Sequence, residues 1–526
     1  MEKMTTWEQW RDWAQTGTWT VLPFAVKCPL AASGLPADWS RAWEEAGPYA
    51  CVLESGKGGR YTFLGLEPVS VIRGKGGEAV VHDLIAGGVS VKSGKPLELL
   101  RDWMAPYRSP AVPELPKFSG GAVGYLAYDV ARSLERLPSL AQDDLGLDDY
   151  VWMQLEELWA IDQVEGDVYC VVHVPIGSPT PEELRESYRR TEMRALRMAQ
   201  RWAGFCAATD TVAALGSAAL SPIGDEELER RRLSVSMTQE AFEAAVRRVQ
   251  EYIAAGDVFQ VNLSLRQAFP LAAAPERVYE QLRWLNPSPY MGMIRFPDFR
   301  LVSASPELLV KVEQGKISTR PIAGTRRRGH TPEEDRRMEE ELRASDKEQA
   351  EHIMLVDLLR NDIGRVAEFG TVRVSELFTV ERYSHVMHLV SEVEGLLGAE
   401  YTIYDAIAAV FPGGTITGAP KVRTMEIIEE LEPVTRGPYT GAMGWIDYAG
   451  NMELNIIIRT LVAKDGVGYL QTGAGIVIDS DPYREYRECF NKARAVALAV
   501  QQTKEEPAGQ SLGQEMRRDD FGDRQL

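Results

Sequence analysis

The sequence predicts a mixed α/β protein of the α+β type, with many short strands and several amphipathic helices. Between residues 18 and 173, β-rich runs alternate with glycine turns. Further along, apolar residues recur with the period of an α-helix after good N-cap residues. The chain has 526 residues and 44% hydrophobic content, which is enough to bury a large core.

The first predicted element is a β-hairpin in residues 49–64. Residues 49–55 (Tyr-Ala-Cys-Val-Leu-Glu-Ser) and 60–64 (Arg-Tyr-Thr-Phe-Leu) are rich in β-formers. Residues 56–59 (Gly-Lys-Gly-Gly) between them form the expected turn.

A long helix is predicted from Thr180 to about Trp202. Thr180 is a good N-cap, Pro181 suits the first helical position, and Glu183 completes a capping box. Residues 204–236 then mix Ala, Gly, Ser and charged residues without a clear period. We therefore expect an N-terminal domain in 1–203, a linker in 204–236, a second domain in 237–502 and a disordered tail in 503–526.

The second domain is predicted to open with a helix that Thr238 caps and Gly256 ends. Its apolar face consists of Phe242, Val246, Val249 and Ile253. Residues 259–264 then alternate as in a strand. One face would carry Phe259, Val261 and Leu263, and the other Gln260, Asn262 and Ser264.

Two later helices carry carboxylates. A capping box at residues 345–348 (Ser-Asp-Lys-Glu) opens a helix that places Glu351 on an apolar face with Leu355 and Leu358. Asp481 followed by Pro482 starts another helix. On that helix Glu488 and Lys492 are four residues apart, a spacing that is also typical of a surface ion pair.

Residues 454–462 (Leu-Asn-Ile-Ile-Ile-Arg-Thr-Leu-Val) are predicted to form one nearly continuous apolar strand. Arg459 lies in the middle of this run. A guanidinium at such a place is costly unless it meets an anion. The anion could be a structural carboxylate or a ligand.

Charge and cysteine usage restrict the class of protein. The formal net charge is -19, which argues against nucleic acid or an acidic membrane surface as a partner. The five cysteines show no CxxC spacing, so neither a disulfide framework nor a zinc site is indicated. No apolar run is long enough to span a bilayer, and we expect a cytoplasmic protein without a membrane partner.

The most informative stretch is residues 411–423 (Phe-Pro-Gly-Gly-Thr-Ile-Thr-Gly-Ala-Pro-Lys-Val-Arg). Glycines, hydroxyls and cations before a helix favour anion binding, although an ordinary helix-entry loop has the same composition. The stretch is not a Walker loop, because Gly418 is followed by Ala-Pro-Lys. Likewise, residues 473–478 (Gly-Ala-Gly-Ile-Val-Ile) lack the last glycine of a dinucleotide fingerprint.

Together with four further blocks, this stretch resembles the chorismate-utilising enzymes. The blocks are Pro-Ile-Ala-Gly-Thr (321–325), Glu-His-Ile-Met-Leu-Val-Asp-Leu-Leu-Arg-Asn-Asp (351–362), His-Val-Met-His (385–388) and Gly-Ala-Gly-Ile-Val (473–477). The resemblance is strong over about residues 238–500. It implies an anthranilate-synthase-like fold, a large mixed β-sandwich with surrounding helices, and chorismate as substrate.

The N-terminal part resembles the amine-forming members of that family. The matching motifs are Val-Leu-Glu-Ser (52–55), Arg-Tyr-Thr-Phe-Leu-Gly (60–65) and Gly-Gly-Ala-Val-Gly-Tyr (120–125). The resemblance also implies that the two parts of the chain form one intertwined sandwich.

Matching the family's motifs residue by residue assigns roles. The implied catalytic residues are His388, Glu307, Gln260 and Thr325. The implied substrate-binding residues are Arg459, Tyr439, Gly473, Gly475, Lys492, Thr417 and Gly418. Glu351 and Glu488 match the family's two magnesium ligands, and Mg²⁺ accepts such oxygen ligands.

The resemblance also bears on the nucleophile and the product. Family members that use water carry a lysine at the position of Gln260, so Gln260 favours ammonia. Residues 260–263 (Gln-Val-Asn-Leu) and Gly413 look like aminodeoxychorismate synthases, whereas Ala323 is usual in anthranilate synthases. We expect the former activity and keep the latter as the alternative. Salicylate or isochorismate synthesis and a non-catalytic regulatory subunit remain further alternatives.

Two partners are implied. The sequence has no Gly-x-Cys-x-Gly elbow, so a separate glutamine amidotransferase subunit is expected to supply ammonia. Two segments resemble a pocket that holds tryptophan or a similar ligand in the family, while a plain interdomain contact is the simpler alternative. The residues of this expected pocket are Leu53, Glu54, Ser55, Asn286, Pro287, Tyr290 and Met291.

Overall fold

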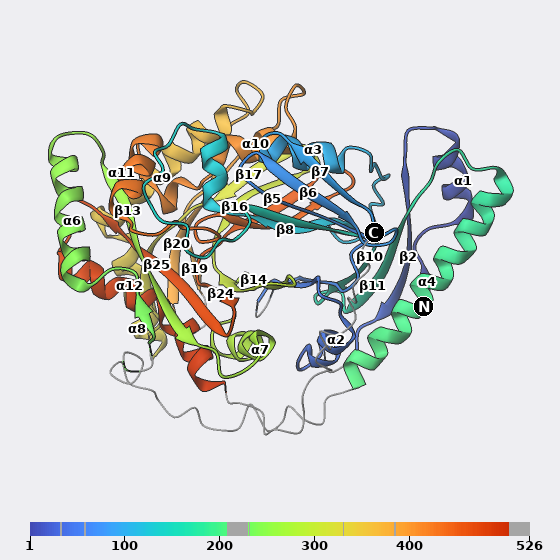
Figure 1. The fold of residues 1–526 in the computed structure, drawn as a ribbon, viewed down its shortest axis with the longest axis horizontal. Coiled ribbons are helices and arrows are strands. Elements are labelled where there is room, and N and C mark those ends of the chain that lie inside the picture. The colour runs from blue at the N-terminus through green and yellow to red at the C-terminus, as the bar shows by residue number, and fades with distance from the viewer. Residues whose placement is uncertain are drawn as a thin grey trace, which may run out of the picture.

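Two large antiparallel β-sheets face each other and carry helices on their outer sides, as the computed structural model shows (Figure 1). The structure describes residues 1–31, 34–56, 59–207, 230, 232–329, 331–382 and 386–503. The predicted mixed α/β class is confirmed.

The first sheet is 13-stranded over the described part of the chain. Its strands, in spatial order, are β1 (Glu2–Lys3), β2 (Val21–Pro29), β11 (Asp167–Pro175), β10 (Glu157–Asp162), β4 (Tyr61–Gly65), β3 (Ala50–Glu54), β14 (Tyr290–Arg295), β15 (Arg300–Ser305), β24 (Thr460–Lys464), β25 (Val467–Ile476), β13 (Gln260–Pro270) and β12 (Ser234–Val235). β21 (Gly418–Ala419) pairs with β13 outside this path.

The second sheet is 12-stranded over the same described residues. Its strands, in spatial order, are β18 (Ile322–Arg327), β20 (Val386–Leu396), β17 (Lys316–Arg320), β16 (Leu308–Glu313), β23 (Met452–Ile456), β22 (Ala442–Asp447), β8 (Gly121–Leu126), β9 (Tyr150–Leu155), β5 (Ser70–Lys75), β6 (Glu78–Asp83) and β7 (Val89–Ser93). β19 (Arg373–Arg382) pairs with β20. Both sheets thus combine strands from before and after residues 204–236.

Helices cover both outer faces. Those against the first sheet are α1 (Trp7–Gln15), α2 (Ser40–Glu45), α4 (Pro181–Ala207), α7 (Pro275–Leu285), α6 (Gln239–Ala254) and α12 (Pro482–Gln502). Those against the second sheet are α3 (Pro96–Met104), α8 (Pro332–Arg343), α9 (Asp346–Gly364) and α10 (Ile403–Val410). α11 (Lys421–Leu431) and the 3-10 turn η3 (Gly414–Ile416) lie where the chain passes between the sheets, and the 3-10 turn η1 (Tyr128–Ser133) connects β8 and β9 of the second sheet.

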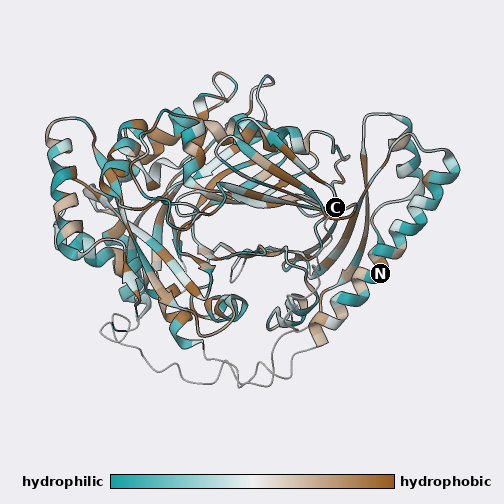
Figure 2. Ribbon diagram, viewed as in Figure 1, coloured by the Kyte–Doolittle hydropathy of each residue, from teal (hydrophilic) through white to brown (hydrophobic). Residues whose placement is uncertain are grey.

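The strands of the first sheet are buried on both faces. In β10, Leu158 and Ala160 point into the core between the sheets, whereas Trp159 and Ile161 point outward against α4. A continuous apolar strand is the pattern expected when both faces are covered. In Figure 2 the hydrophobic residues concentrate along the strands, while outer helices such as α4 and α6 carry many hydrophilic residues.

Local sequence signals predicted several elements correctly. The hairpin forms as β3 and β4, although residues 57 and 58 of its turn lie outside the described residues. α4 begins at Pro181 with the Thr180–Glu183 capping box and extends to Ala207, five residues beyond the prediction. Most of the expected linker and residues 504–526 of the tail lie outside the described residues.

Two strand predictions need correction. Phe259 precedes β13 and is 70% exposed, so it does not share the buried face of Val261 and Leu263. The opposite face of β13 is buried too, because Gln260, Asn262 and Ser264 point into the protein. Residues 454–462 are not one strand, since β23 ends at Ile456 in the second sheet and β24 begins at Thr460 in the first.

Candidate functional site

The site is built where β13 pairs with both β25 and β21. Gln260 lies opposite Ala419 of β21, and Gly475 lies opposite Asn262. A Cβ atom at Gly475 would lie 2.4 Å from Gln260 Nε2, and one at Gly473 would lie 2.9 Å from Tyr439 Oη. The two glycines therefore leave room for the Gln260 amide and the Tyr439 phenol.

The glycine-rich stretch 411–423 packs against the start of β13. Thr417 is buried, and its hydroxyl donates to the Gly413 carbonyl at 3.0 Å. Gly418 has φ +130°, and a Cβ there would lie 2.0 Å from the Gln260 carbonyl oxygen. Because this backbone conformation is rarely open to other residues, glycine is required at position 418.

The cations of this stretch are engaged by carboxylates. Lys421 Nζ donates to Asp362 at 2.7 Å, and the Arg423 guanidinium donates to Asp257 at 3.0 Å and Glu426 at 2.8 Å. Within the folded chain these two cations therefore already have carboxylate partners. The glycines and hydroxyls of the stretch remain candidates for ligand contact.

Arg459 lies where the chain crosses from one sheet to the other. It adopts φ +50°, and its backbone carbonyl accepts from Ala304 N at 3.2 Å. Among the described residues, no carboxylate forms an ion pair or hydrogen bond with the guanidinium. Burial lowers the pKa of Arg459, and the carboxylates of Glu307 and Glu488 oppose this effect. The backbone thus holds Arg459 in a position with little access to water. No carboxylate of the described residues lies within ion-pair distance of its guanidinium.

Glu307 lies beside this crossing, between β15 and β16. Its carbonyl accepts from Ile456 N at 3.0 Å, and its side chain is buried. Burial raises the pKa of Glu307 to about 7, against the opposing effects of the nearby Thr415 hydroxyl, Arg459 and Lys492. A carboxyl that titrates near neutral pH is suited to proton transfer.

His388 reaches the same region from β20. Burial, together with the smaller effect of the Arg459 charge, lowers the pKa of His388 to about 4, so the imidazole is neutral at pH 7. The Gly324 carbonyl opposes this shift through a hydrogen bond. Thr325 lies opposite His388 in the β18–β20 register, and its side chain lies outside the described residues.

Lys492 lies between Gly473 of β25 and the Glu488 side chain of α12. Its Nζ donates to the Gly473 carbonyl at 3.0 Å and lies 3.7 Å from Glu488 Oε1. Both side chains of this pair are nearly half exposed, so their direct attraction is weak. Asp481 caps α12, as predicted, and thereby fixes the start of the helix that carries them.

The two proposed metal ligands come from different helices, α9 for Glu351 and α12 for Glu488. The side chain of Glu351 lies outside the described residues. Within the described part of the chain, no three His, Cys, Asp or Glu side chains gather into a ready metal site. The exposed Glu488 carboxylate is of the hard oxygen type that suits Mg²⁺, with a ligand's carboxylate as a further donor.

Sequence reasoning missed the buried ion pair beneath the site. Arg436 and Glu432 are only 3% and 4% exposed, and their side chains meet at 2.7 Å. Their spacing of four residues is usual for a surface pair on a helix. Their burial follows from the tertiary packing, and no local signal indicates it.

The two segments of the expected aromatic-ligand pocket lie side by side. Glu54 of β3 pairs with Met291 of β14, and Leu53 is partly buried next to it. A Cβ at Gly56 would lie 2.3 Å from the Ser288 carbonyl, in the middle of residues 286–291. Ser55, Asn286, Pro287 and Tyr290 belong to these adjoining segments, and their role as a ligand pocket stays a prediction.

Glu54 is held by residues that the sequence did not single out. Its carboxylate accepts from Arg283 at 2.9 Å, from Trp39 Nε1 at 3.3 Å and from the Tyr279 hydroxyl. Glu280, also buried, accepts from Trp39 N at 2.9 Å, and burial raises the pKa of Glu280 to about 7. Trp39 and α7 lie far from Glu54 in sequence, so only the folded chain reveals this network.

In the part of the chain that the structure describes, no helix combines the length and the apolar character needed to cross a bilayer.

The profile of the chorismate binding enzyme family matches residues 49–498. Aminodeoxychorismate synthase component 1 of Bacillus subtilis is 43% identical over 455 residues, which are 86% of this chain and 92% of that protein. Anthranilate synthase component 1 of Thermus thermophilus is 45% identical over 461 residues, which are 87% and 93% of the two chains.

Solved structures show the same fold. Anthranilate synthase component I from Streptococcus pneumoniae matches with a TM-score of 0.68 and 34% identity, over 84% of this chain and 92% of that one. The isochorismate synthase MenF of Escherichia coli matches with a TM-score of 0.64 and 16% identity, over 93% and 98% of the two chains. The latter likeness concerns the fold alone.

Proposed function

The chain belongs to the chorismate binding enzyme family, and from this premise we propose that it aminates chorismate with ammonia to give 4-amino-4-deoxychorismate. The match covers most of the chain and most of the length of these relatives, which supports the same reaction class for this chain. The predicted resemblance to the chorismate-utilising enzymes is thereby confirmed at the level of the family.

The observation that carries the proposal is the uncompensated guanidinium of Arg459. Chorismate is a dianion, and a planar guanidinium binds a carboxylate through two parallel hydrogen bonds. Tyr439, Lys492 and the backbone of Gly473 and Gly475 surround the same place. We assign these residues to the substrate carboxylates, with Thr417 and Gly418 beside them.

Gln260 is the reason for choosing ammonia over water. A neutral amide cannot deprotonate water, whereas ammonia is already a competent nucleophile. The amide lies against Gly475, where the glycine leaves room for it. Gln260 and Thr325 would orient the nucleophile and the ring, while the family's hydrating members carry a lysine in place of the glutamine.

The proposed chemistry needs a proton donor near the departing hydroxyl. Ammonia adds at ring carbon C2, the double bonds shift, and the C4 hydroxyl leaves as water. A second ammonia then adds at C4, the double bonds shift back, and the C2 amine leaves as ammonia. Glu307, whose pKa is about 7, is the proposed acid, and the remaining ring nitrogen of neutral His388 would accept a hydrogen bond from the departing water.

We assign Mg²⁺ to Glu351 and Glu488. When bound, the ion would neutralise part of the charge that two carboxylates and an anionic substrate bring together. The nearby Arg459 and Lys492 contribute positive charge to the same region.

Anthranilate synthesis is the second candidate, and Ala323 favours it. Anthranilate synthases carry alanine at this position, and relatives with that name are as similar to the chain as the aminodeoxychorismate synthase. The two reactions share the C2 adduct and differ in whether a base removes the C2 proton and pyruvate leaves. Residues 260–263 and Gly413 lead us to prefer the second amination.

We propose that a separate glutamine amidotransferase supplies the ammonia. The relatives are named as component 1, which implies a second component, and the chain lacks an amidotransferase nucleophile elbow. The purified chain should therefore turn over chorismate with Mg²⁺ and ammonium salts and should not do so with glutamine. Turnover with glutamine alone would contradict the separate subunit. Binding of chorismate without any turnover would instead indicate a non-catalytic subunit.

A further inference from the structure

The segment between α11 and β22, residues 432–441, carries Tyr439 and is organised around one guanidinium. Arg436 donates to both carboxylate oxygens of Glu432, at 2.7 and 2.9 Å. It also donates to the carbonyls of Asn262 at 2.6 Å and Ile416 at 3.0 Å, and to the Thr440 hydroxyl at 3.3 Å. One buried side chain thus connects β13, η3 and the Tyr439 segment, which all line the site.

Glu432 extends these contacts to β25. Its Oε1 accepts from the backbone N and the hydroxyl of Ser264, both at 2.8 Å. The same hydroxyl accepts from Gln471 Nε2 at 2.9 Å. Since Gly473 and Gly475 follow Gln471 on β25, the ion pair is linked to both strands that face the substrate.

Two aromatic rings lie near the guanidinium. Its carbon lies 5.0 Å from the centre of the Tyr128 ring and 5.5 Å from that of Tyr439. The Tyr439 side chain therefore contacts Arg436 through its ring, and its hydroxyl lies against the bare backbone of Gly473. A shift of the guanidinium would displace the phenol that we assign to the substrate.

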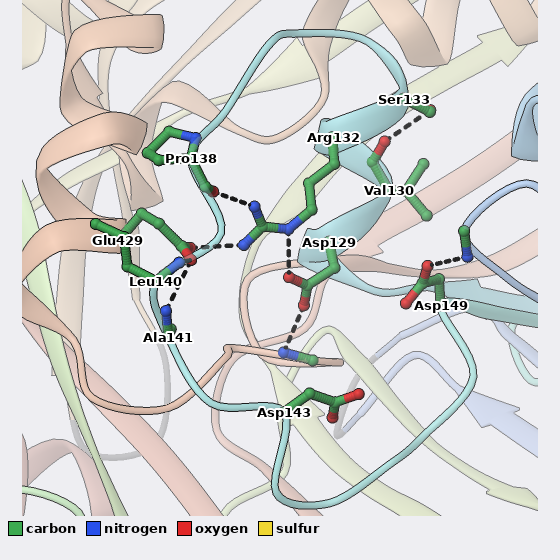
Figure 3. A network of polar contacts seen from close by, with 12 residues as sticks. Asp129, Val130, Arg132, Ser133, Pro138, Leu140, Ala141, Asp143, Asp149 and Glu429 are labelled. Atoms are coloured by element: carbon green, nitrogen blue, oxygen red, sulfur yellow. Dashed lines mark hydrogen bonds and ion pairs between the residues drawn. The ribbon is translucent and has the colours of Figure 1, made fainter.

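Residues of η1, early in the chain, also contact the Tyr439 segment. Figure 3 shows the hydrogen bonds of two of them, Asp129 and Arg132. Asp129 Oδ2 accepts from Gly437 N at 3.0 Å, and Tyr128 N donates to the Gly437 carbonyl at 2.7 Å. Arg132 donates to Asp129 at 3.2 Å. Two hydrogen bonds with η1 therefore fix the position of Gly437, the residue next to Arg436.

Arg132 also anchors η1 to α11. It donates to Glu429 Oε2 at 2.6 Å and to the Pro138 carbonyl (Figure 3). Glu429 Oε1 accepts from Leu140 N at 2.6 Å and Ala141 N at 2.9 Å. Residues 128–141, far earlier in the chain, therefore contact both the middle of the Tyr439 segment, at Gly437, and the helix α11 that precedes it, at Glu429.

We infer that Arg436 is a positioning residue for chorismate amination. It acts through Tyr439 and the carbonyl of Asn262, and η1 holds its segment in place. The inference rests on the proposed function. The alternative is a purely structural ion pair. Burying two charges is costly, so such a pair contributes little net stability compared with apolar residues of similar size. A purely structural pair should therefore be replaceable without loss of activity, whereas replacement of a positioning residue should lower activity.

The test is the double variant Glu432→Gln/Arg436→Met. It removes both charges together and so avoids leaving one buried charge unpaired. We expect a folded protein with a lower unfolding temperature, because the buried carbonyls of Asn262 and Ile416 lose a donor, and a fall in kcat/KM for chorismate of about tenfold or more, since small misplacements of binding groups are costly. A folded double variant with wild-type kcat/KM would overturn the inference.

A matched control uses an ion pair away from the site. Lys117 Nζ lies 2.6 Å from Glu453 Oε1, and both side chains are mostly buried. Lys117→Met/Glu453→Gln makes the same chemical change and should leave kcat/KM unchanged. An equal loss of kcat/KM in both double variants would show a general effect of charge removal and would also overturn the inference.

Asp129→Ala provides an independent test from the other side of the segment. It removes the acceptor for Gly437 N and leaves every residue of the proposed substrate site intact. We expect KM for chorismate to rise several-fold, about fivefold, with a smaller change in kcat. If the double variant fails to fold, unchanged KM in Asp129→Ala refutes the positioning role. Failure of the proposed function is distinguishable, because the wild type itself would then not consume chorismate.

Discussion

Arg459→Met should weaken chorismate binding and stabilise the free protein at the same time. The guanidinium is shielded from water without a carboxylate within ion-pair distance in the described part of the chain, and burial lowers its pKa. Folding therefore disfavours its charge. Methionine has a similar length and carries no charge. Arginine and methionine have the same backbone strain at φ +50°, so this strain does not contribute to the difference in stability between the two proteins.

The two effects can be estimated. Each hydrogen bond from a charged donor contributes about 1.5–3 kcal/mol, so loss of a bidentate contact should cost at least about 3 kcal/mol. This corresponds to on the order of 100-fold weaker binding. Relief of the shielded charge should raise the free energy of unfolding by about 1 kcal/mol.

The assay pairs calorimetric binding of chorismate with Mg²⁺, in the absence of ammonium, with thermal unfolding of the free protein. Arg300→Met is the matched control. Burial also lowers the pKa of Arg300, but its guanidinium donates to the Phe296 carbonyl at 2.6 Å. The control should lose stability and keep its affinity. If Arg459→Met loses stability and keeps its affinity, Arg459 is a structural residue and the reasoning is wrong.

Three other predictions concern acidic residues and the aromatic-ligand pocket. The folded-state pKa of Glu307, about 7, lies above the ordinary value of 4.5, so its contribution to stability is present below pH 4.5 and is lost as the pH rises through 7. Glu307→Gln should therefore unfold at a higher temperature than the wild type at pH 8 but not at pH 4, and an inflection of kcat/KM near pH 7 should disappear; an unchanged pH profile would exclude Glu307 from proton transfer. Glu351→Gln and Glu488→Gln should abolish turnover and weaken Mg²⁺-dependent chorismate binding in calorimetry while circular dichroism stays unchanged, and near-normal activity at limiting Mg²⁺ would remove that residue from the metal site. Tryptophan should bind near Glu54 in calorimetry without strong inhibition, whereas inhibition at micromolar concentration would favour anthranilate synthesis.

Elements with local signals could be predicted from the sequence. Thr180, Thr238 and Asp481 cap helices where the residue pattern indicated them, because a cap depends on its own next three residues. The hairpin of β3 and β4 follows from glycines between β-rich runs. The blocks that resemble the family supplied the site residues, and composition or periodicity alone would not have done so.

Features that depend on tertiary packing could not be predicted. The apolar run around Arg459 is split because the chain changes sheets there, and apolar residues continue on both sides of the crossing. The alternation of apolar and polar residues begins at Phe259, but β13 and its burial begin only at Gln260. Arg436 and Glu432 look like a surface pair until β13 and η1 bury them.

The identity of the product tests the proposed function most directly. The purified protein is incubated with chorismate, Mg²⁺ and ammonium, and the products are separated before and after addition of a lyase specific for 4-amino-4-deoxychorismate. We predict 4-aminobenzoate that forms only after the lyase is added. Fluorescent anthranilate that appears without the lyase would contradict the proposed second amination.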